Sequence, residues 1–143
     1  MLEKILILGL PGSGKTTLAR PFAELIGGVH INADDIRKKY HDWDFSPEGR
    51  MRQAQRMRYL ADGVAMAGKV AVADFVAPTD QARMIFNADF TVWMDTIKES
   101  KYENTNKIFV KPAHWDYHVA EWFDDTHLQL MQVVKTWMER NRV

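Results

Sequence analysis

Short apolar runs alternate along the chain with longer segments in which apolar residues recur at helical spacing. Residues 5–8 are continuously apolar and Gly9 closes the run, which is typical of a strand buried on both faces of a parallel sheet. Residues 16–26 carry apolar side chains at helical spacing before a Gly-Gly pair, so a helix is predicted there. Similar short apolar runs predict further strands at 29–32, 70–73, 90–95 and 117–119.

The pair Ser46-Pro47 predicts the start of a long helix. Serine is a preferred N-cap, and proline suits the first helical position because the N–H that it lacks would have no helical partner there. This helix is expected to run to about Ala67, with Gly68 just past its end.

The remaining segments are shorter or less regular. Short helices are predicted near residues 34–37 and 79–86. A last helix is expected to begin with Asp124 or Asp125 as its cap. Residues 96–107 are polar and lack a clear period, which predicts a mobile loop. The apolar positions of the last helix are Leu128, Met131, Val134, Trp137 and Met138.

The alternation of strands and helices predicts an α/β fold. Consecutive parallel strands are joined by right-handed crossover helices, which pack on the two faces of the sheet. We therefore expect three layers, with about five parallel strands between the helices, in a single domain that covers residues 1–143. Ligands of such sheets bind at the carboxyl ends of the strands, and every motif described below falls at such an end.

Composition narrows the class of protein. Hydrophobic residues make up 46% and charged residues 27%, which suits a globular domain with a core of useful size. The formal net charge is +0, so no global field draws the chain to nucleic acid or to an anionic membrane. The chain contains no cysteine, which excludes disulfides, thiolate metal sites and cysteine nucleophiles. The run at 5–8 is too short for a signal sequence or a membrane span, so the cytoplasm is the expected compartment.

The strongest motif lies directly after the first predicted strand. Residues 9–16 read Gly-Leu-Pro-Gly-Ser-Gly-Lys-Thr and match the pattern G-x-x-x-x-G-K-[ST] in full. Glycines let the backbone N–H groups turn inward around phosphates, and the following helix adds its positive dipole end. A chance match in a glycine-rich turn is the alternative, but the buried strand before it and the amphipathic helix after it supply the context that the mechanism needs. The motif predicts ATP and Mg²⁺ as cofactors and a nucleoside-kinase-like P-loop NTPase fold.

Two side chains of this motif have predicted chemical roles. Lys15 is expected to reach the β- and γ-phosphates as a point charge, and the Thr16 hydroxyl is expected to be a ligand of Mg²⁺. The nucleotide-binding residues are expected to be Gly9, Pro11, Gly12, Ser13, Gly14, Lys15, Thr16 and Thr17.

Asp74 is the second predicted metal residue. It ends the apolar run 70–73, and this pattern resembles a Walker B strand, whose carboxylate orients Mg²⁺ or its water shell. The alternative is an ordinary strand-end residue or turn cap, since strands often end in Asp.

A second carboxylate follows the second predicted strand. Kinases that phosphorylate hydroxyl groups need a group that accepts or orients the proton of the acceptor, and Asp34 is placed for this role as a general base. The alternative is that Asp34 and Asp35 cap a short helix and favour its dipole. Both roles are compatible with each other.

Arginines gather on the helix after Ser46. Arg52 and Arg56 lie one turn apart on one face, and guanidinium groups bind phosphate or sulfate in a bidentate way. A solvated helix face is the alternative, and for the set as a whole it is the better interpretation of the sequence. The set consists of Arg50, Arg52, Arg56 and Arg58.

These motifs together resemble those of adenylylsulfate kinases, which phosphorylate the 3′-hydroxyl of adenosine 5′-phosphosulfate with MgATP. The second motif of that family reads Asp-Gly-Asp-Asn-Val-Arg. Asp34 and Arg37 match its second Asp and its Arg, whereas Asn32 and Asp35 replace its first Asp and its Asn. The resemblance covers roughly residues 5–95.

The resemblance implies roles for several residues of an acceptor region at about 32–58. Asp34 is the implied base. Phe75, with the segment that follows it, is implied to pack against the acceptor adenine. The implied substrate-binding residues are Arg37, Arg50, Gln53 and Phe75.

The resemblance weakens in the lid at about 96–107. There the family has an Arg-Asp-x-Lys-Gly-Leu-Tyr stretch, whereas this chain has a short lid that contains no arginine. Lys98 or Lys101 is therefore the candidate for the lid cation. The chain is also shorter than typical members of the family.

Two other functions are compatible with the motifs. Residues 30–37 are also similar to the acceptor motif of phage-type polynucleotide 5′-hydroxyl kinases. In such a kinase Asp34 and Arg37 would keep their roles. Kinases of hydroxymethylated bases in phage DNA are a related possibility. The neutral net charge counts against a nucleic-acid partner and favours a small nucleotide-like acceptor. A nucleotide-binding ATPase switch would leave Asp34 and Arg37 unexplained.

The histidine and aromatic residues give only weak indications of function in the sequence. The five histidines lack a metal-ligand spacing and are interpreted as surface or strand-end residues. Trp43 and Phe45 lie beside the acceptor motif, where they could stack on a base or close over the core. Core packing or the face of a homodimer is expected for Trp115, Trp122, Phe123 and Trp137.

Overall fold

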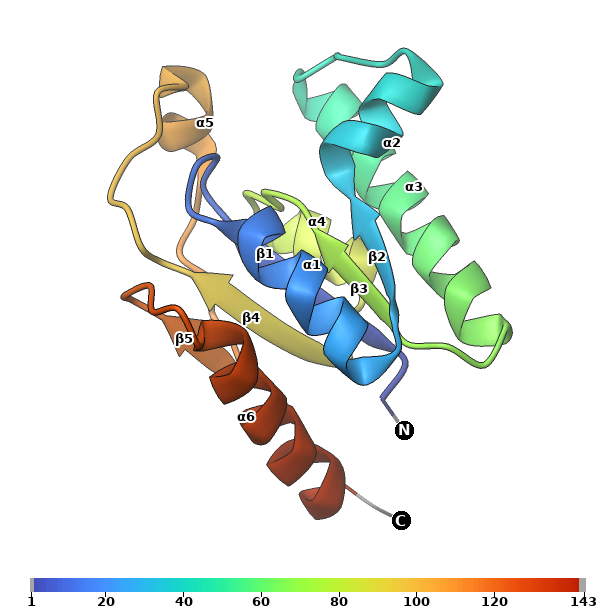
Figure 1. Cartoon of the computed structure of the whole chain (residues 1–143). Helices are drawn as coiled ribbons and strands as arrows, with labels where there is room; N and C mark the ends of the chain where they lie inside the picture. The colour runs from blue at the N-terminus through green and yellow to red at the C-terminus, as the bar shows by residue number, and fades with distance from the viewer. Residues whose placement is uncertain (1, 142–143) are drawn as a thin grey trace.

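The computed structural model of the protein describes residues 2–141 and forms one five-stranded parallel sheet between two layers of helices (Figure 1). The strands are β1 (Lys4–Gly9), β2 (Val29–Asn32), β3 (Ala71–Asp74), β4 (Phe90–Met94) and β5 (Tyr117–Val119), in the spatial order β2-β3-β1-β4-β5. The helices are α1 (Lys15–Ile26), α2 (Ala33–Tyr40), α3 (Pro47–Met66), α4 (Asp80–Phe86), α5 (Glu103–Ile108) and α6 (Thr126–Arg140). The predicted three-layer α/β fold is confirmed.

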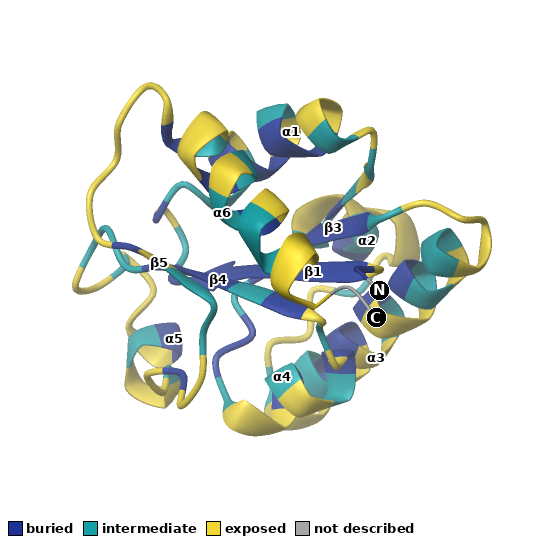
Figure 2. Cartoon of the chain, turned by 90° about the horizontal axis from the view of Figure 1, so that it is seen from below, coloured by how far each residue is buried: buried dark blue, intermediate teal, exposed yellow. Residues whose placement is uncertain are grey.

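The central strand shows why the sequence folds in this way. All six residues of β1 are buried, and its side chains alternate between the two faces of the sheet. Ile5 and Ile7 pack in the core beneath α1 and α6, whereas Leu6 and Leu8 pack in the core against α3 and α4. Figure 2 shows this arrangement edge-on, with the dark sheet between the two helical layers. A continuous apolar run is needed because both faces are covered.

The register of the strands brings the predicted motifs to one edge. Asp74 at the end of β3 pairs with Asn32 at the end of β2 on one side and with Ile7 of β1 on the other. Gly9, where β1 ends, pairs with Met94 at the end of β4. In Figure 1 the loop after β1 lies at this edge between α5 and the α2–α3 connection. The site is therefore assembled at the carboxyl ends of the strands, as expected for such a sheet.

The long helix α3 begins where the sequence predicts. Ser46 accepts a hydrogen bond from Gly49 N at 3.2 Å, and Pro47 takes the first helical position. The helix ends at Met66, and Gly68 just beyond it has a left-handed φ of 81°.

The lid prediction is wrong in part, because residues Glu103–Ile108 form the helix α5. Contacts that a periodicity analysis cannot see stabilise it. The Asn106 side chain accepts a hydrogen bond from Ser100 N at 2.8 Å and donates one to Ser100 O at 2.8 Å. Thr105 is buried against the rest of the protein. The prediction of irregular structure holds only for the first part of the lid.

Two predictions for α6 are also corrected. Asp125 does stand at the N-cap position, but its side chain makes no cap hydrogen bond and instead accepts one from Gln129 at 2.8 Å. Leu128 and Met138 are about half exposed, whereas Leu130, which was not among the predicted apolar positions, is buried. The other predicted positions, Met131, Val134 and Trp137, do pack in or against the core. Among the aromatic residues, Trp115 and Trp137 pack against the core, which was one of the two expected roles. Trp122 and Phe123 are exposed, and the alternative role in a homodimer face stays a prediction for them. Within residues 2–141, none of the helices is long and apolar enough to cross a membrane.

Candidate active site

The loop between β1 and α1 has the conformation that a phosphate-binding loop requires. Gly12 and Gly14 have φ angles of 85° and 95°, in the left-handed region that favours glycine. At Gly9 a Cβ atom would lie 2.6 Å from the carbonyl oxygen of Met94, so only glycine fits between β1 and β4. The loop is closed by a hydrogen bond from Ser13 N to Leu10 O at 3.1 Å. The first turn of α1 therefore offers its N–H groups to an anion.

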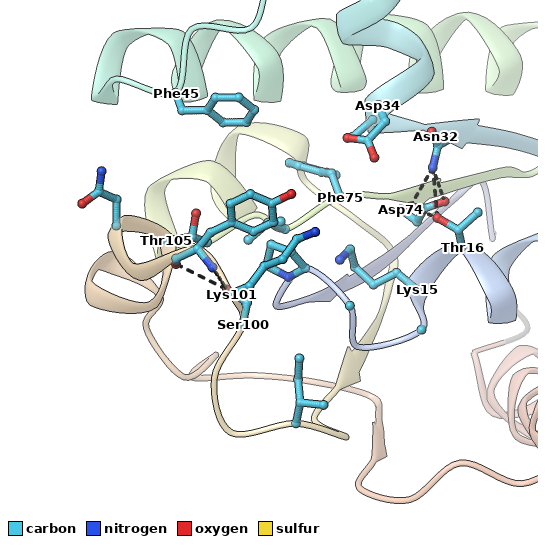
Figure 3. A pocket seen from close by; sticks show the side chains of 18 of the residues that line it. Lys15, Thr16, Asn32, Asp34, Phe45, Asp74, Phe75, Ser100, Lys101 and Thr105 are labelled. Carbon is cyan, nitrogen blue, oxygen red and sulfur yellow. Dashed lines mark hydrogen bonds between the residues drawn. The ribbon is translucent and has the colours of Figure 1, made fainter.

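Lys15 is held in place by the loop itself. Its ammonium group donates a hydrogen bond to Leu10 O at 3.0 Å across the loop. Burial lowers the pKa of Lys15, whereas the negative charges of Asp74 and Asp34 act in the opposite direction. Both carboxylates therefore lie near enough to interact with this ammonium group. Figure 3 shows Lys15 at the floor of a cavity, with its nitrogen turned inward.

Three polar side chains meet beside the P-loop at the ends of α1, β2 and β3. Thr16 Oγ1 donates a hydrogen bond to Asp74 Oδ1 at 3.1 Å. Asn32 Nδ2 lies 3.0 Å from Thr16 Oγ1 and 3.2 Å from Asp74 Oδ1. Asp74 is 2% exposed, so its carboxylate is held by these donors rather than by solvent.

The chemistry of this group fits Mg²⁺. A hydroxyl and a carboxylate offer the hard oxygen ligands that Mg²⁺ prefers, and the remaining ligands commonly come from substrate phosphates and water. The part of the chain that the structure describes holds no cluster of three or more His, Cys, Asp or Glu side chains that could bind a metal alone. Thr16 and Asp74 would accordingly hold the ion together with a nucleotide.

His30, which was expected to be a surface or strand-end residue, belongs to this group. His30 Nε2 contacts Asp74 Oδ2, and the His30 side chain is mostly buried. The sequence carried a signal of this contact, since His30 and Asn32 are two residues apart on one strand and so face the same side.

A cavity of about 1380 Å³ opens above the P-loop (Figure 3). It is lined by the P-loop, by the α2–α3 region and by the lid. Typical small-molecule pockets measure about 300–1,000 Å³, so this cavity has room for the phosphates of one ligand and for a second molecule.

Asp34 stands in the wall of this cavity. It lies in the first turn of α2, but the cap of that helix is the Asn32 side chain, which accepts a hydrogen bond from Asp35 N at 3.0 Å. Asp34 is exposed, and its carboxylate is directed into the cavity (Figure 3). Asn32 and not Asp34 therefore caps α2, and the Asp34 carboxylate is not occupied by a capping hydrogen bond.

Arg37 and Gln53 lie behind the cavity wall. Arg37 is buried and donates hydrogen bonds to the carbonyl oxygens of Asp42 at 3.0 Å and Asp44 at 3.1 Å. Gln53 is buried and donates to Ala33 O at 2.9 Å, directly before Asp34. In this structure both side chains hold the acceptor region in shape, and their implied contact with an acceptor stays a prediction.

Arg50 does line the cavity and connects two elements. Its Nε donates to Phe45 O at 2.9 Å, and its Nη2 donates to Thr105 Oγ1 of α5 at 3.0 Å. Burial lowers the pKa of Arg50, and the group still carries a full positive charge at neutral pH. Arg50 therefore joins the start of α3 to the lid at the rim of the cavity.

The two lysines proposed for the lid differ in position. Lys101 lines the cavity, and its side chain extends into it in Figure 3. Lys98 is not among the described residues that line the cavity. The structure thus separates two candidates that the sequence left equal.

Arg52 and Arg56 are neutralised within the protein. Arg52 forms ion pairs with Asp42 at 2.9 Å and Asp44 at 3.0 Å, and Arg56 pairs with Asp42 at 2.7 Å. These contacts lower the pKa of Asp42, mainly through the hydrogen bond from Arg52, and raise that of Arg52. The pairing accounts for these arginines without a ligand.

Four aromatic side chains form part of the cavity wall. Trp43 and Phe45 come from the α2–α3 connection, and Tyr102 comes from the lid; each is about half exposed. Phe75 follows β3 and is 5% exposed, with its ring packed edge-on against Phe86. Such a wall suits a flat ring more than an aliphatic ligand.

The fold and this site together define a P-loop domain of the kind found in small-molecule kinases. The chain belongs to the AAA_33 family, since the model of that family, described as an AAA domain, matches residues 5–95. The resemblance noted from the motifs is confirmed by a curated relative from Aeropyrum pernix named as a probable adenylyl-sulfate kinase. This relative is 34% identical over 88 residues, which cover 54% of this chain and 45% of the relative. The chain spans less than half the length of the curated relatives that it matches.

Solved structures show the same fold. The APS kinase of Mycobacterium tuberculosis in complex with AMPPNP and APS superposes with a TM-score of 0.78 at 14% identity, over 94% of this chain and 98% of that one. Shikimate kinase from Aquifex aeolicus superposes with a TM-score of 0.67 at 12% identity, over 96% and 99% of the two chains. At such identities the likeness establishes the architecture, and the P-loop NTPase fold class predicted from the sequence is confirmed.

Proposed function

We propose that this protein is an ATP-dependent phosphotransferase that moves the γ-phosphoryl group to a hydroxyl group, with adenylylsulfate as the leading acceptor. One observation carries the proposal. One cavity contains both the P-loop, with Lys15 at its floor, and the carboxylate of Asp34 in its wall. This carboxylate is not used to cap α2, because Asn32 is the cap. A donor phosphate and an acceptor hydroxyl can therefore meet between groups suited to charge stabilisation and to proton acceptance.

The proposed mechanism assigns each step to residues of the chain. Lys15 and the N–H groups of the P-loop stabilise charge on the β- and γ-phosphates. Mg²⁺, held by Thr16 and Asp74, would neutralise further charge on the phosphates. A bond forms between the acceptor oxygen and the γ-phosphorus while the bond from that phosphorus to the leaving oxygen of ADP breaks. Asp34 takes the proton of the acceptor hydroxyl.

The acceptor assignment rests on several agreements. The curated relative of Aeropyrum pernix is a probable adenylyl-sulfate kinase, and the Mycobacterium tuberculosis structure holds APS. The aromatic wall of Phe45, Phe75 and Tyr102 suits an adenine ring, and Arg50 and Lys101 supply positive charge beside it for an anionic group.

A hydroxyl kinase that acts on a nucleic acid or on a modified base is the second candidate. One observation favours it. Trp43 and Phe45, which line the cavity, are exposed enough to stack on a base.

The test is transfer of label from γ-labelled ATP with Mg²⁺, with adenylylsulfate, a 5′-hydroxyl oligonucleotide and no acceptor offered in parallel. Label on adenylylsulfate is the expected result. Label on the oligonucleotide would instead assign the chain to the nucleic-acid kinases, and equal ATP hydrolysis without any acceptor would indicate an ATPase switch. Lys15→Ala serves as the background control, since loss of charge at the β- and γ-phosphates should abolish transfer.

A further inference from the structure

His30 lies behind the proposed metal site on the edge strand β2. Side chains alternate along a strand, so His30 and Asn32 face the same side of the sheet, while Ile31 between them is buried in the opposite core. Asn32 pairs with Asp74 in the neighbouring strand. This register places the His30 ring beside the Asp74 carboxylate, where Nε2 contacts Oδ2.

The two oxygens of Asp74 have different partners. Oδ1 accepts hydrogen bonds from Thr16 Oγ1 at 3.1 Å and from Asn32 Nδ2 at 3.2 Å. Among residues 2–141, Oδ2 has the contact with His30 and otherwise only a long one of 3.4 Å from Asn32 Nδ2. His30 is therefore the principal partner of Oδ2, and loss of its ring would free the carboxylate to turn.

The orientation of the Asp74 carboxylate is important for metal binding in this chain. Asn32 stands where the motif of adenylylsulfate kinases has an Asp, so Asp74 supplies the only negative charge among Thr16, Asn32 and itself. The Asp74 side chain is 3% exposed, and solvent cannot replace a lost partner.

We propose that His30 is a positioning residue that fixes Asp74 with Oδ1 toward Thr16 and thereby sets the affinity of the site for Mg²⁺ in the presence of ATP. The proposal rests on the donor half of the proposed function, the binding of MgATP, and is independent of the acceptor. Partners behind metal ligands orient those ligands, and their loss typically lowers metal affinity by about 10- to 100-fold.

The first experiment measures metal binding directly. Mn²⁺, a spectroscopic substitute for Mg²⁺, is titrated into the ATP complex of the wild-type protein and of His30→Leu, and free Mn²⁺ is followed by electron paramagnetic resonance. We expect His30→Leu to weaken Mn²⁺ binding by roughly tenfold while the affinity for metal-free ATP changes by less than about twofold. His30→Gln keeps a donor on a flexible side chain and should recover part of the loss.

The chain offers a matched control in a second histidine–aspartate pair. His118 Nε2 lies 2.9 Å from Asp95 Oδ2 at the neighbouring ends of β5 and β4, and neither Thr16 nor Asn32 takes part in its side-chain contacts. His118→Leu should leave Mn²⁺ affinity unchanged. The proposal is overturned if His30→Leu binds Mn²⁺ as the wild type does, or if His118→Leu loses as much affinity.

A measurement on the wild-type protein covers the case in which His30→Leu does not fold. With ¹⁵N-labelled histidine, the His30 Nε2 resonance should shift when Mg²⁺ is added to the ATP complex, while that of His118 stays in place. An unchanged His30 resonance would contradict the proposal. Failure of the wild type to bind ATP would instead refute the proposed function itself, and failure to phosphorylate the tested acceptors would leave the role of His30 standing.

Discussion

Among single residues, Asp34 has the clearest predicted effect on the reaction. Its carboxylate is free because Asn32 caps α2, so Asp34→Asn removes a proton acceptor without removing a cap. We expect kcat to fall by roughly 10²- to 10⁴-fold, while the dissociation constant of ATP changes little. Steady-state kinetics and isothermal titration calorimetry check the two quantities separately.

Asp35→Asn is the matched control for this variant, since Asp35 is the next residue, is exposed and is not among the described residues that line the cavity. It should behave like the wild type. If Asp34→Asn changes only KM for the acceptor, Asp34 binds substrate and the base lies elsewhere.

The lid lysines provide a second prediction at this scale. Lys101 reaches the cavity and is our candidate for the lid cation, so Lys101→Ala should lower kcat/KM by roughly 10- to 100-fold through lost charge stabilisation. Lys98→Ala, a change of the same size in the same segment, should stay within about twofold of the wild type. Equal losses in both variants would show that the lid acts through its general charge and not through Lys101.

At the scale of elements, helix caps show how local sequence controls stability. Ser46 accepts the hydrogen bond of Gly49 N, whereas Asp125 occupies the N-cap position of α6 without a cap bond. Ser46→Ala should lower the free energy of unfolding by about 1 kcal/mol, the usual cost of a lost cap. Urea denaturation monitored by circular dichroism measures it.

Asp125→Ala is the comparison for this prediction. It loses only an exposed contact with Gln129 and should cost less than half as much as the loss of the Ser46 cap. If Asp125→Ala lowered the free energy of unfolding more than Ser46→Ala does, the presence of a cap hydrogen bond would not predict the contribution of a cap residue to stability.

For the whole molecule, the paired carboxylates predict how stability depends on pH. The pKa values of three carboxyls are held below their ordinary value of 3.8 by hydrogen bonds. The main donor is Arg52 for Asp42, Ser46 for Asp44 and Lys4 for Asp62. A carboxyl whose pKa is lower in the folded state stabilises the protein fully above its unfolded pKa and loses this contribution as the pH falls through the folded pKa. The free energy of unfolding should therefore be level near neutral pH and decline below about pH 4.

Urea titrations between pH 7 and pH 3 test this behaviour. Because these groups lie near the surface, added salt should reduce the effect. The double variant Asp42→Asn, Asp44→Asn should show a shallower acid decline than the wild type. A decline of the same steepness in both proteins would place the acid sensitivity in other groups.

Local sequence determined most of the elements of this protein. Chemical propensity acts over a few residues, so the buried run of β1, the glycines of the P-loop and the Ser46-Pro47 start of α3 were all predictable. The P-loop also made the donor side of the site predictable, because its motif is continuous in the chain.

Contacts between distant residues were decided only by the tertiary structure. The helix α5 is tied to the start of α3 by the hydrogen bond from Arg50 to Thr105. These two residues are 55 positions apart, and no local period reports such a contact. The burial of Arg37, the position of Lys101 in the cavity and the contact of His30 with Asp74 also depend on how elements pack. Sequence alone determined which residue types were available for chemistry, and strand register and packing decided which of them meet, because hydrogen bonds and ion pairs depend on distance in space and not on distance along the chain.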